Sequence, residues 1–223
     1  LTHPTLLLHP HPKRVLIIGG GDGGILRQCL KHPVEEAYLV EIDSYVVNIC
    51  KKYLSSIAGG AFEDKRATVL IEDGFSFLKR NEQKFDVIIV DSTDPVGEAE
   101  KLFSQEFYQL SYNALGNDGV FITQSGSLFY QPKLIRDVYH KLSSLFSKLA
   151  FVLIPVPTYP GVIWTATLAS KLYDPLRIES QEWLKRAQAR GLKTRYWSPN
   201  LQFFPPDFPF LKRILEEGNA FVT

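Results

Sequence analysis

Two carboxylates, Asp91 and Asp94, follow directly after the apolar run 87–90 (VIIV) and stand just before Pro95. Four consecutive β-branched residues predict a strand that is buried on both faces of a parallel sheet. In open α/β sheets, ligands bind outside the carboxyl ends of the strands, where both acids are expected to lie. Pro95 biases the residue before it toward an extended conformation and stiffens the turn. The two acids suit the capture of a cation, although a helix cap and an ordinary turn residue would explain them as well.

A glycine-rich loop, GGGDGG at residues 19–24, stands between a predicted strand and a predicted helix. It satisfies the spacing G-x-G-x-x-G in the context that this motif requires. Glycines let the backbone approach a ligand closely, and the following helix offers free N–H groups. The sequence therefore predicts a nucleoside ligand here, contacted by Gly19, Gly21 and Gly23.

Two further acids indicate which nucleoside is bound. Glu41 ends the next predicted strand, 20 residues after Gly21, where a carboxylate can accept hydrogen bonds from both ribose hydroxyls. Asp22 lies in the middle of the glycine loop, where it would repel a pyrophosphate. An acid there suits a ligand with an ammonium or sulfonium group and argues against NAD.

Three other strand ends carry candidate binding residues. Asp73 and Gly74 follow a predicted strand, where Asp73 would accept a hydrogen bond from an adenine amino group or cap the next helix. Gln124 closes another predicted strand. Tyr159 lies in the turn PTYP (157–160) of a predicted hairpin, either facing a pocket mouth or packing under the turn.

Strands and helices alternate along most of the chain, which is typical of a doubly wound α/β fold with a mostly parallel sheet. The last two strands have no helix between them and therefore predict an antiparallel hairpin at one edge. Seven strands with this ending resemble the Rossmann-like fold of S-adenosylmethionine-dependent transferases, an analogy at the level of fold. The predicted strands are 15–18, 37–40, 68–71, 87–90, 120–123, 150–155 and 162–169, and the predicted helices are 26–31, 45–54, 75–80, 104–115, 132–146, 179–190 and 211–215.

The domain organisation predicted from these patterns has three parts. Residues 1–12 contain three His-Pro pairs without a helical or strand period, so an extended segment is expected there rather than a metal-binding tract. Residues 13–173 form the nucleoside-binding catalytic domain. Residues 174–223 form a helical and aromatic extension, packed on the sheet domain or on a partner chain.

Composition excludes several classes of function. The chain has 223 residues, 45% of them hydrophobic, and a net charge of +1, which gives no electrostatic footprint for nucleic acid or an anionic membrane. No apolar run has the length of a membrane span, and no signal segment opens the chain. Cys29 and Cys50 match no metal or redox spacing and are expected to be reduced core residues of a cytoplasmic protein. The chain has no Met, which suggests that an N-terminal segment is missing.

The ordered set of motifs resembles the spermidine synthase family, the polyamine aminopropyltransferases. The resemblance covers about residues 1–175 well and the tail more loosely. GGGDGG, DSTDP and PTYP together make it specific. In chain order the motifs are GGGDGG at 19–24, VEID at 40–43, EDG at 72–74, DSTDP at 91–95, TQ at 123–124 and PTYP at 157–160.

The resemblance implies a reaction in polyamine biosynthesis. Family members transfer an aminopropyl group from decarboxylated S-adenosylmethionine to a diamine such as putrescine, giving spermidine and methylthioadenosine. The donor is a co-substrate, and neither a prosthetic group nor a metal is needed. By resemblance Asp91 is the base that deprotonates the amine, assisted by Tyr159. Asp94, with Gln124 and Tyr159, binds the amine.

On the donor side, the resemblance assigns Asp22 to the amino group of the nucleoside sulfonium, and Glu41 to its ribose. Asp73 and Gly74 would contact the adenine, and the glycine loop would approach the ligand. Members of the family form homodimers or homotetramers, so a homo-oligomer is expected.

Two departures from the family pattern matter. The family carries an N-terminal β domain that covers the donor site; it is absent here, and residues 1–12 look like the remnant of the linker that follows it. Many members also carry an acid two residues after the strand-end Gln, where this chain has Gly126. The acceptor therefore stays open among putrescine, agmatine, cadaverine and a longer polyamine.

Three other functions remain beside the aminopropyltransferase. One is a related amine N-methyltransferase that uses S-adenosylmethionine itself. Another is a non-catalytic nucleoside-binding relative, against which the intact Asp91, Asp94 and Tyr159 weigh. An NAD-dependent dehydrogenase comes last because Asp22 crowds the phosphate position.

Overall fold

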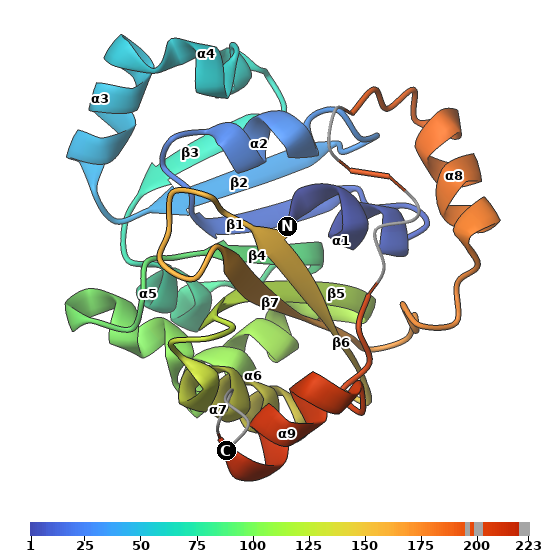
Figure 1. The fold of residues 1–223 in the computed structure, drawn as a ribbon. Helices are drawn as coiled ribbons and strands as arrows, with labels where there is room; N and C mark the ends of the chain where they lie inside the picture. Colours follow the sequence, from blue (N-terminus) through green and yellow to red (C-terminus); the bar gives the residue numbers. More distant parts are fainter. Residues whose placement is uncertain (195–196, 199–202, 219–223) are drawn as a thin grey trace.

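The computed structural model describes residues 1–194, 197–198 and 203–218, and it contains a seven-stranded sheet between two layers of helices (Figure 1). The strand order is β3-β2-β1-β4-β5-β7-β6. The pairs from β3 through β5 are parallel, whereas β7 runs antiparallel to both β5 and β6. This confirms the predicted doubly wound sheet and its terminal hairpin. The strands are β1 Arg14–Gly19, β2 Glu36–Glu41, β3 Ala67–Ile71, β4 Phe85–Asp91, β5 Leu115–Ser127, β6 Lys148–Pro155 and β7 Ile163–Ser170.

The strand order reverses at β1, which has β2 on one side and β4 on the other. Gly19 and Asp91, the last residues of β1 and β4, are partners in the parallel register. Ligands of doubly wound sheets bind at such a switch point. The glycine loop and the first carboxylate of DSTDP therefore meet at this end of the sheet.

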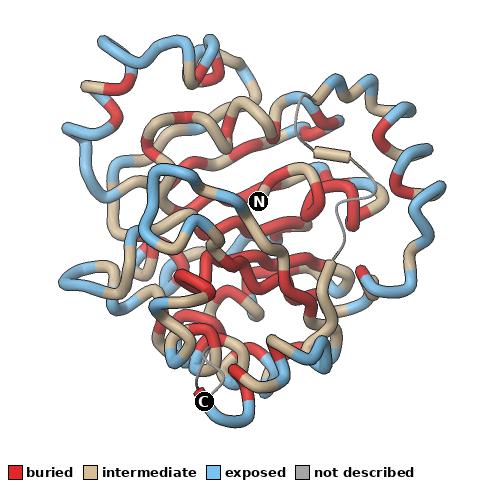
Figure 2. The backbone as a smooth tube through the Cα atoms, viewed as in Figure 1, coloured by how far each residue is buried: buried red, intermediate tan, exposed pale blue. Residues whose placement is uncertain are grey.

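Alternate residues of the central strands bury against opposite helix layers. Val15 and Ile17 pack in the cluster that includes α1, α2 and α8, and Leu16 and Ile18 pack in the cluster that includes α5, α6 and α7. The continuous apolar runs of β1 and β4 follow from this double coverage. Figure 2 shows these strands as the buried centre of the molecule. The helices are α1 Thr2–Leu8, α2 Gly24–Cys29, α3 Ser44–Tyr53, α4 Ser55–Ala58, α5 Gly74–Arg80, α6 Gln105–Ala114, α7 Pro132–Ser143, α8 Ser180–Ala189 and α9 Pro209–Glu217, with short 3₁₀ helices η1 Ala61–Glu63 and η2 Gly97–Phe103.

The prediction of an extended segment at residues 1–12 is wrong, because Thr2–Leu8 forms α1. Pro4 stands in the first turn, where its missing N–H breaks no helical hydrogen bond. Leu6, Leu7 and Leu8 are all fully buried. A helix that is enclosed on every side shows no amphipathic period, and this is why the pattern gave no helix signal.

Two arginines of the C-terminal region hold α1 in place. Arg186 of α8 donates to the carbonyls of Leu7 and Leu8, at 2.9 Å each. Arg190 donates to three more carbonyls, those of Leu6, His9 and Pro10. These bonds satisfy carbonyl groups that the end of a helix leaves without an intrahelical partner.

The two helices of the described C-terminal region, α8 and α9, also pack on the sheet domain. Trp183 and Ala187 of α8 belong to the same buried cluster as α1 and α2. Leu211 and Ile214 of α9 pack with α7 and β6. The aromatic segment that begins at Tyr196 lies partly outside the described residues. Among the described helices, none combines the length and the apolar character needed to span a bilayer.

Candidate active site

The glycine loop lies directly against the end of β4. Gly20 N donates to the carbonyl oxygen of Asp91 at 3.1 Å. Gly19 has a φ of +80°, and a Cβ there would lie 2.2 Å from that same oxygen. Only glycine allows this approach. The loop and Asp91 are therefore held together by backbone contacts.

Glu41, at the end of β2, is fixed by two backbone donors. Gly21 N donates to its Oε2 at 3.1 Å, and Asp43 N donates to its Oε1 at 3.0 Å. A Cβ on Gly21 would lie 2.8 Å from Glu41 Cγ, so the glycine is required by the close approach of this side chain. Each carboxylate oxygen keeps a second lone pair that can accept a hydroxyl proton.

Asp22 lies at the start of α2 and is half-buried. Its Oδ1 accepts a hydrogen bond of 2.8 Å from Gly24 N. Gly23 has a φ of +77°, and a Cβ there would lie 2.7 Å from the Phe62 ring. The loop conformation is thus specified by its glycines.

Asp91 is half-buried among other acids, and its pKa is raised above the ordinary value. Burial is the largest cause of the raised pKa, and the carboxylates of Asp22 and Glu41 add to it. These two neighbouring carboxylates disfavour the ionised form of Asp91. They also give this end of the sheet an affinity for cationic ligands.

Asp73 and Gly74 have clear structural roles at the start of α5. Asp73 is the N-cap, since its Oδ1 accepts from Ser76 N at 2.7 Å. This confirms the helix cap that the sequence offered as one explanation of the residue. A Cβ on Gly74 would lie 2.4 Å from Ile18 Cγ2, so close packing against β1 requires this glycine. Contact of either residue with an adenine ring stays a prediction.

The side of the site that follows β4 and β5 contains Asp94, Gln124 and Tyr159. Gln124 is 6% exposed, and its Nε2 donates to Thr93 O at 3.2 Å, which ties it to the DSTDP loop. Tyr159 is 52% exposed and lies in the loop between β6 and β7, which Figure 2 shows on the surface. Its ring meets that of Trp164 edge-on, with centroids 5.0 Å apart.

Residues 1–178 match the family model described as the spermine/spermidine synthase domain. The chain belongs to this family. Polyamine aminopropyltransferases of Caldicellulosiruptor saccharolyticus and Bacillus subtilis are 47% and 40% identical to it. The first alignment covers 97% of this chain and 76% of the relative, and the second covers 90% and 71%.

Solved spermidine synthases have the same fold. One of them, in complex with the transition-state analogue AdoDATO, superposes with a TM-score of 0.88 at 38% identity, over 96% of this chain and 73% of its own. The spermidine synthase of Thermotoga maritima gives a TM-score of 0.84 at 37% identity, over 96% and 72% of the two chains. Both comparisons agree with the family resemblance predicted from the motifs.

Two site residues of this family member were not predicted from the sequence. Trp164 Nε1 donates to Gln124 Oε1 at 3.2 Å, so this indole orients the amide. Gln131 Nε2 donates to Asp94 Oδ2 at 2.9 Å. Neither residue lies in a motif. The only signal for Trp164 is its position near the start of β7, where it pairs with Ser127 beyond Gln124.

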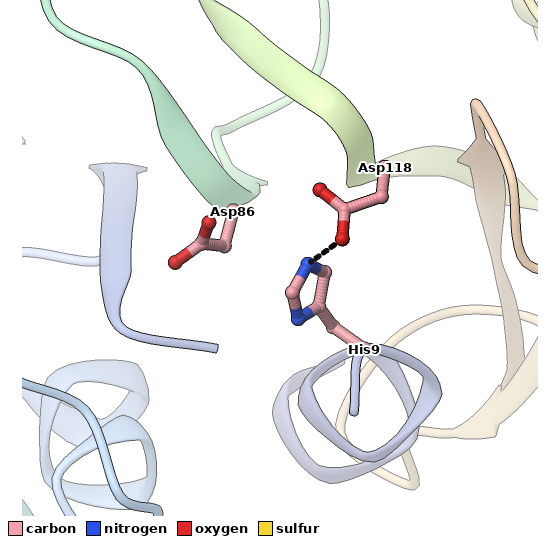
Figure 3. A group of neighbouring side chains, drawn as sticks. All are labelled: His9, Asp86 and Asp118. Carbon is pink, nitrogen blue, oxygen red and sulfur yellow. Dashed lines mark ion pairs between the residues drawn. The ribbon is translucent and has the colours of Figure 1, made fainter. Parts of the chain in front are cut away.

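A separate group of possible metal ligands lies at the opposite end of the sheet, where Asp86 is the second residue of β4. Ligand atoms of His9, Asp86 and Asp118 lie within 4.8 Å of one another (Figure 3). His9 Nε2 faces Asp118 Oδ2 at 3.2 Å.

The hydrogen bonds of this cluster argue against a cation. His9 Nδ1 accepts from His11 N at 3.2 Å, so the ring proton of the neutral imidazole is on Nε2, the atom that would have to bind the metal. Burial lowers the pKa of His9, which favours this neutral form. Asp86 Oδ2 already accepts from Lys13 N and Arg14 N. The cluster therefore joins the segment after α1 to the sheet.

Proposed function

We propose that this member of the spermine/spermidine synthase family transfers an aminopropyl group from decarboxylated S-adenosylmethionine to putrescine, which gives spermidine and methylthioadenosine. The observation that carries the proposal is Asp91, a half-buried carboxyl group with a raised pKa at the switch point of the sheet. A base is most effective when its pKa approaches the working pH. The acids around Asp91 suit a cationic sulfonium donor and a cationic amine.

The reaction needs little besides a base and correct positioning. The neutral amine nitrogen attacks the methylene carbon bonded to the sulfonium; a C–N bond forms, and the C–S bond breaks with its electron pair going to sulfur. In the proposed mechanism Asp91, assisted by Tyr159, takes one proton from the acceptor ammonium before the attack, because only the neutral amine has a free lone pair. The product is a secondary ammonium, and Asp91 passes its proton to solvent. Positioning the two substrates in line supplies the rest of the rate enhancement.

On the donor side, we assign the ribose hydroxyls to Glu41 and the amino group of the donor to Asp22. The backbone of the loop at Gly19, Gly21 and Gly23 would approach the nucleoside. The adenine is assigned to Asp73 with Gly74, in addition to their part in starting α5. The two backbone bonds to Glu41 support its assignment, because they hold both oxygens before the ligand arrives.

On the amine side, Asp94 is the proposed anchor for the ammonium of the acceptor, with Gln124 and Tyr159 beside it. Putrescine is the first acceptor to test. Gly126 supplies no charge after the strand-end Gln124, and agmatine, cadaverine and spermidine are therefore the next candidates.

The test is an assay of methylthioadenosine release, followed by chromatography, with decarboxylated S-adenosylmethionine and each amine in turn. We expect release with putrescine or one of the other three amines, and none with S-adenosylmethionine as donor. Methylation of the amine by S-adenosylmethionine would instead favour an N-methyltransferase. Titration calorimetry gives the second measurement: methylthioadenosine should bind and NAD should not. Binding without turnover of any amine would contradict the transferase proposal for this chain.

We also propose that the protein works in the cytoplasm as a homodimer or homotetramer. Its two cysteines, Cys29 and Cys50, are buried free thiols, as expected for a reducing compartment. The oligomeric state rests on the family resemblance alone. Light scattering after size-exclusion chromatography measures it directly, and a monomer would contradict it.

A further inference from the structure

Gln131 connects two loops of the amine side that are far apart in the sequence. Its Nε2 donates to Asp94 Oδ2 at 2.9 Å, and its Oε1 accepts from Ser127 N at 2.8 Å. Asp94 belongs to the loop after β4, whereas Ser127 ends β5. A single amide side chain therefore fixes the carboxylate of the DSTDP loop relative to the end of the neighbouring strand.

The backbone of Gln131 is itself firmly held. Its N–H donates to Ser127 O at 3.0 Å, which closes the turn that follows β5. Its carbonyl accepts from the N–H groups of Leu134 and Ile135 in the first turn of α7. Since both the N–H and the carbonyl of Gln131 are hydrogen-bonded, its side-chain amide extends toward Asp94 from a fixed backbone position.

The strand next to Gln131 leaves room for its side chain. The pairing of β5 with β7 is irregular between Gln124 and Gly126, and Gly126 has a φ of +96°. A Cβ on Gly126 would lie 2.7 Å from Gln131 Oε1. Real Cβ atoms do not approach an oxygen this closely, so a side chain at position 126 would displace the amide.

We propose that Gln131 is a positioning residue for the acceptor amine, and that it acts by orienting the Asp94 carboxylate. This inference rests on the proposed function of Asp94 as the amine anchor. An amide is a neutral donor, so it fixes one carboxylate oxygen and leaves the full negative charge of Asp94 for the ammonium. Gly126 supports this role of Gln131, because a residue without a side chain leaves space for the Gln131 amide.

The first test is Gln131→Met, which keeps the length of the side chain and removes both of its hydrogen bonds. The KM for the amine is expected to rise about tenfold, as for the loss of one hydrogen bond to a charged group. The kcat should stay within about twofold, and so should the affinity for methylthioadenosine, because the side-chain hydrogen bonds of Gln131 go to Asp94 and Ser127. Gln105→Met is the matched control, since Gln105 hydrogen-bonds on the exposed surface of α6.

The outcomes separate this inference from the proposed function. If the wild-type protein is active and Gln131→Met has the same amine KM, the positioning role is wrong and the proposed function stands. If methylthioadenosine binding is lost together with amine binding, Gln131 supports the fold rather than the amine site. If the wild-type protein transfers no aminopropyl group to any amine, the proposed function itself fails.

A second variant reaches the same contact from the other side. Gly126→Ala adds a methyl group that would lie 2.7 Å from Gln131 Oε1 and 3.0 Å from Leu134 Cδ2, and we expect it to raise the amine KM as Gln131→Met does. Gly60→Ala controls for backbone strain, because Gly60 has a φ of +84° and open space around the position of the added Cβ. An unchanged amine KM in Gly126→Ala, in protein that still binds methylthioadenosine, would overturn the role of Gly126.

Discussion

The donor side and the amine side of the site hold their polar groups in different ways. On the donor side, Glu41, Asp22 and Asp73 all accept hydrogen bonds from backbone N–H groups. On the amine side, Asp94 accepts from the side chain of Gln131, and Gln124 accepts from the side chain of Trp164 in addition to one backbone donor, Gly126 N. A backbone donor keeps its place whatever residue carries it, whereas a side-chain donor is lost with one substitution. One substitution can therefore remove a donor from the amine side, whereas the backbone donors of the donor side remain.

The largest effect is expected at Asp91, which borders both sides. Asp91→Asn removes the proposed base and should lower kcat by about a thousandfold, within the range that general base catalysis contributes. Methylthioadenosine should still bind within a few-fold of the wild-type affinity, because the backbone carbonyl of residue 91 still accepts from Gly20 N. Turnover numbers and calorimetry check the two parts.

Asp137→Asn is the matched control, because Asp137 pairs with Lys141 on the exposed surface of α7. The Asp137→Asn variant should keep the wild-type kcat and the wild-type affinity for methylthioadenosine. Turnover of Asp91→Asn at the level of this control would remove Asp91 from the role of base.

The second prediction tests the backbone-held donor side. Glu41→Gln replaces one acceptor oxygen by an NH₂ group, which then faces the N–H of either Gly21 or Asp43. We expect the affinity for methylthioadenosine to fall about 10- to 100-fold, the scale of a hydrogen bond to a charged group. With saturating donor, the amine KM should not change. Glu35→Gln, an exposed acid paired with Lys13, is the control; an equal loss of affinity in both variants would contradict the assignment.

The sequence predicted the donor side well because its signals are local. A glycine required by a close approach, such as Gly21 beside Glu41, appears directly as a motif. The mostly parallel sheet and its terminal hairpin followed from the alternation of strands and helices and from the missing helix before β7. Gln131 was not predicted, because its contact with Asp94 joins residues that are 37 positions apart and belong to no repeating pattern.

Contacts between distant parts of the sequence also explain why the sequence predicted an extended segment where the structure has α1. Leu6–Leu8 are buried on every side. The groups that donate hydrogen bonds to their carbonyls are Arg186 and Arg190, which lie more than 170 residues later in the chain. Periodicity records which side of a helix faces water. It therefore misses a helix that has no such side.

The third prediction concerns the contact between α1 and α8, which is also held by side chains. Arg190 can only donate, so it donates to His32 Nδ1; His32 then donates to His3 Nδ1, and His3 to Gln28 Oε1. This order keeps both imidazoles neutral. Burial, the largest cause, lowers the pKa of His3 to about 4 and that of His32 to about 3, from 6.5.

Below about pH 6.5 these two histidines become protonated in the unfolded chain but stay neutral in the folded protein. Their contribution to the stability of the fold is therefore full above about pH 6.5 and is lost progressively as the pH falls toward 4. The free energy of unfolding should thus rise with pH across this window, by about 1.4 kcal/mol per pH unit for each histidine. Urea unfolding at a series of pH values measures the slope. His32→Gln should lower it by about one histidine's share, and an unchanged slope would contradict the neutral pair.

The smallest effect is expected from Trp164→Phe, which sharpens the comparison on the amine side. The substitution removes the N–H that donates to Gln124 Oε1 and keeps a ring against Tyr159. Gln124 Oε1 still accepts from Gly126 N, so the amide loses only one of its two fixed donors. The amine KM should rise about two- to fivefold, the scale of one neutral hydrogen bond.

Trp183→Phe is the control, because it also removes an indole donor, the one that bonds to Ile178 O. This variant should lower the stability of the protein and leave the amine KM unchanged. If both variants raise the amine KM equally, the effect reflects general loosening of the fold, and the side-chain network around Gln124 does not set amine binding.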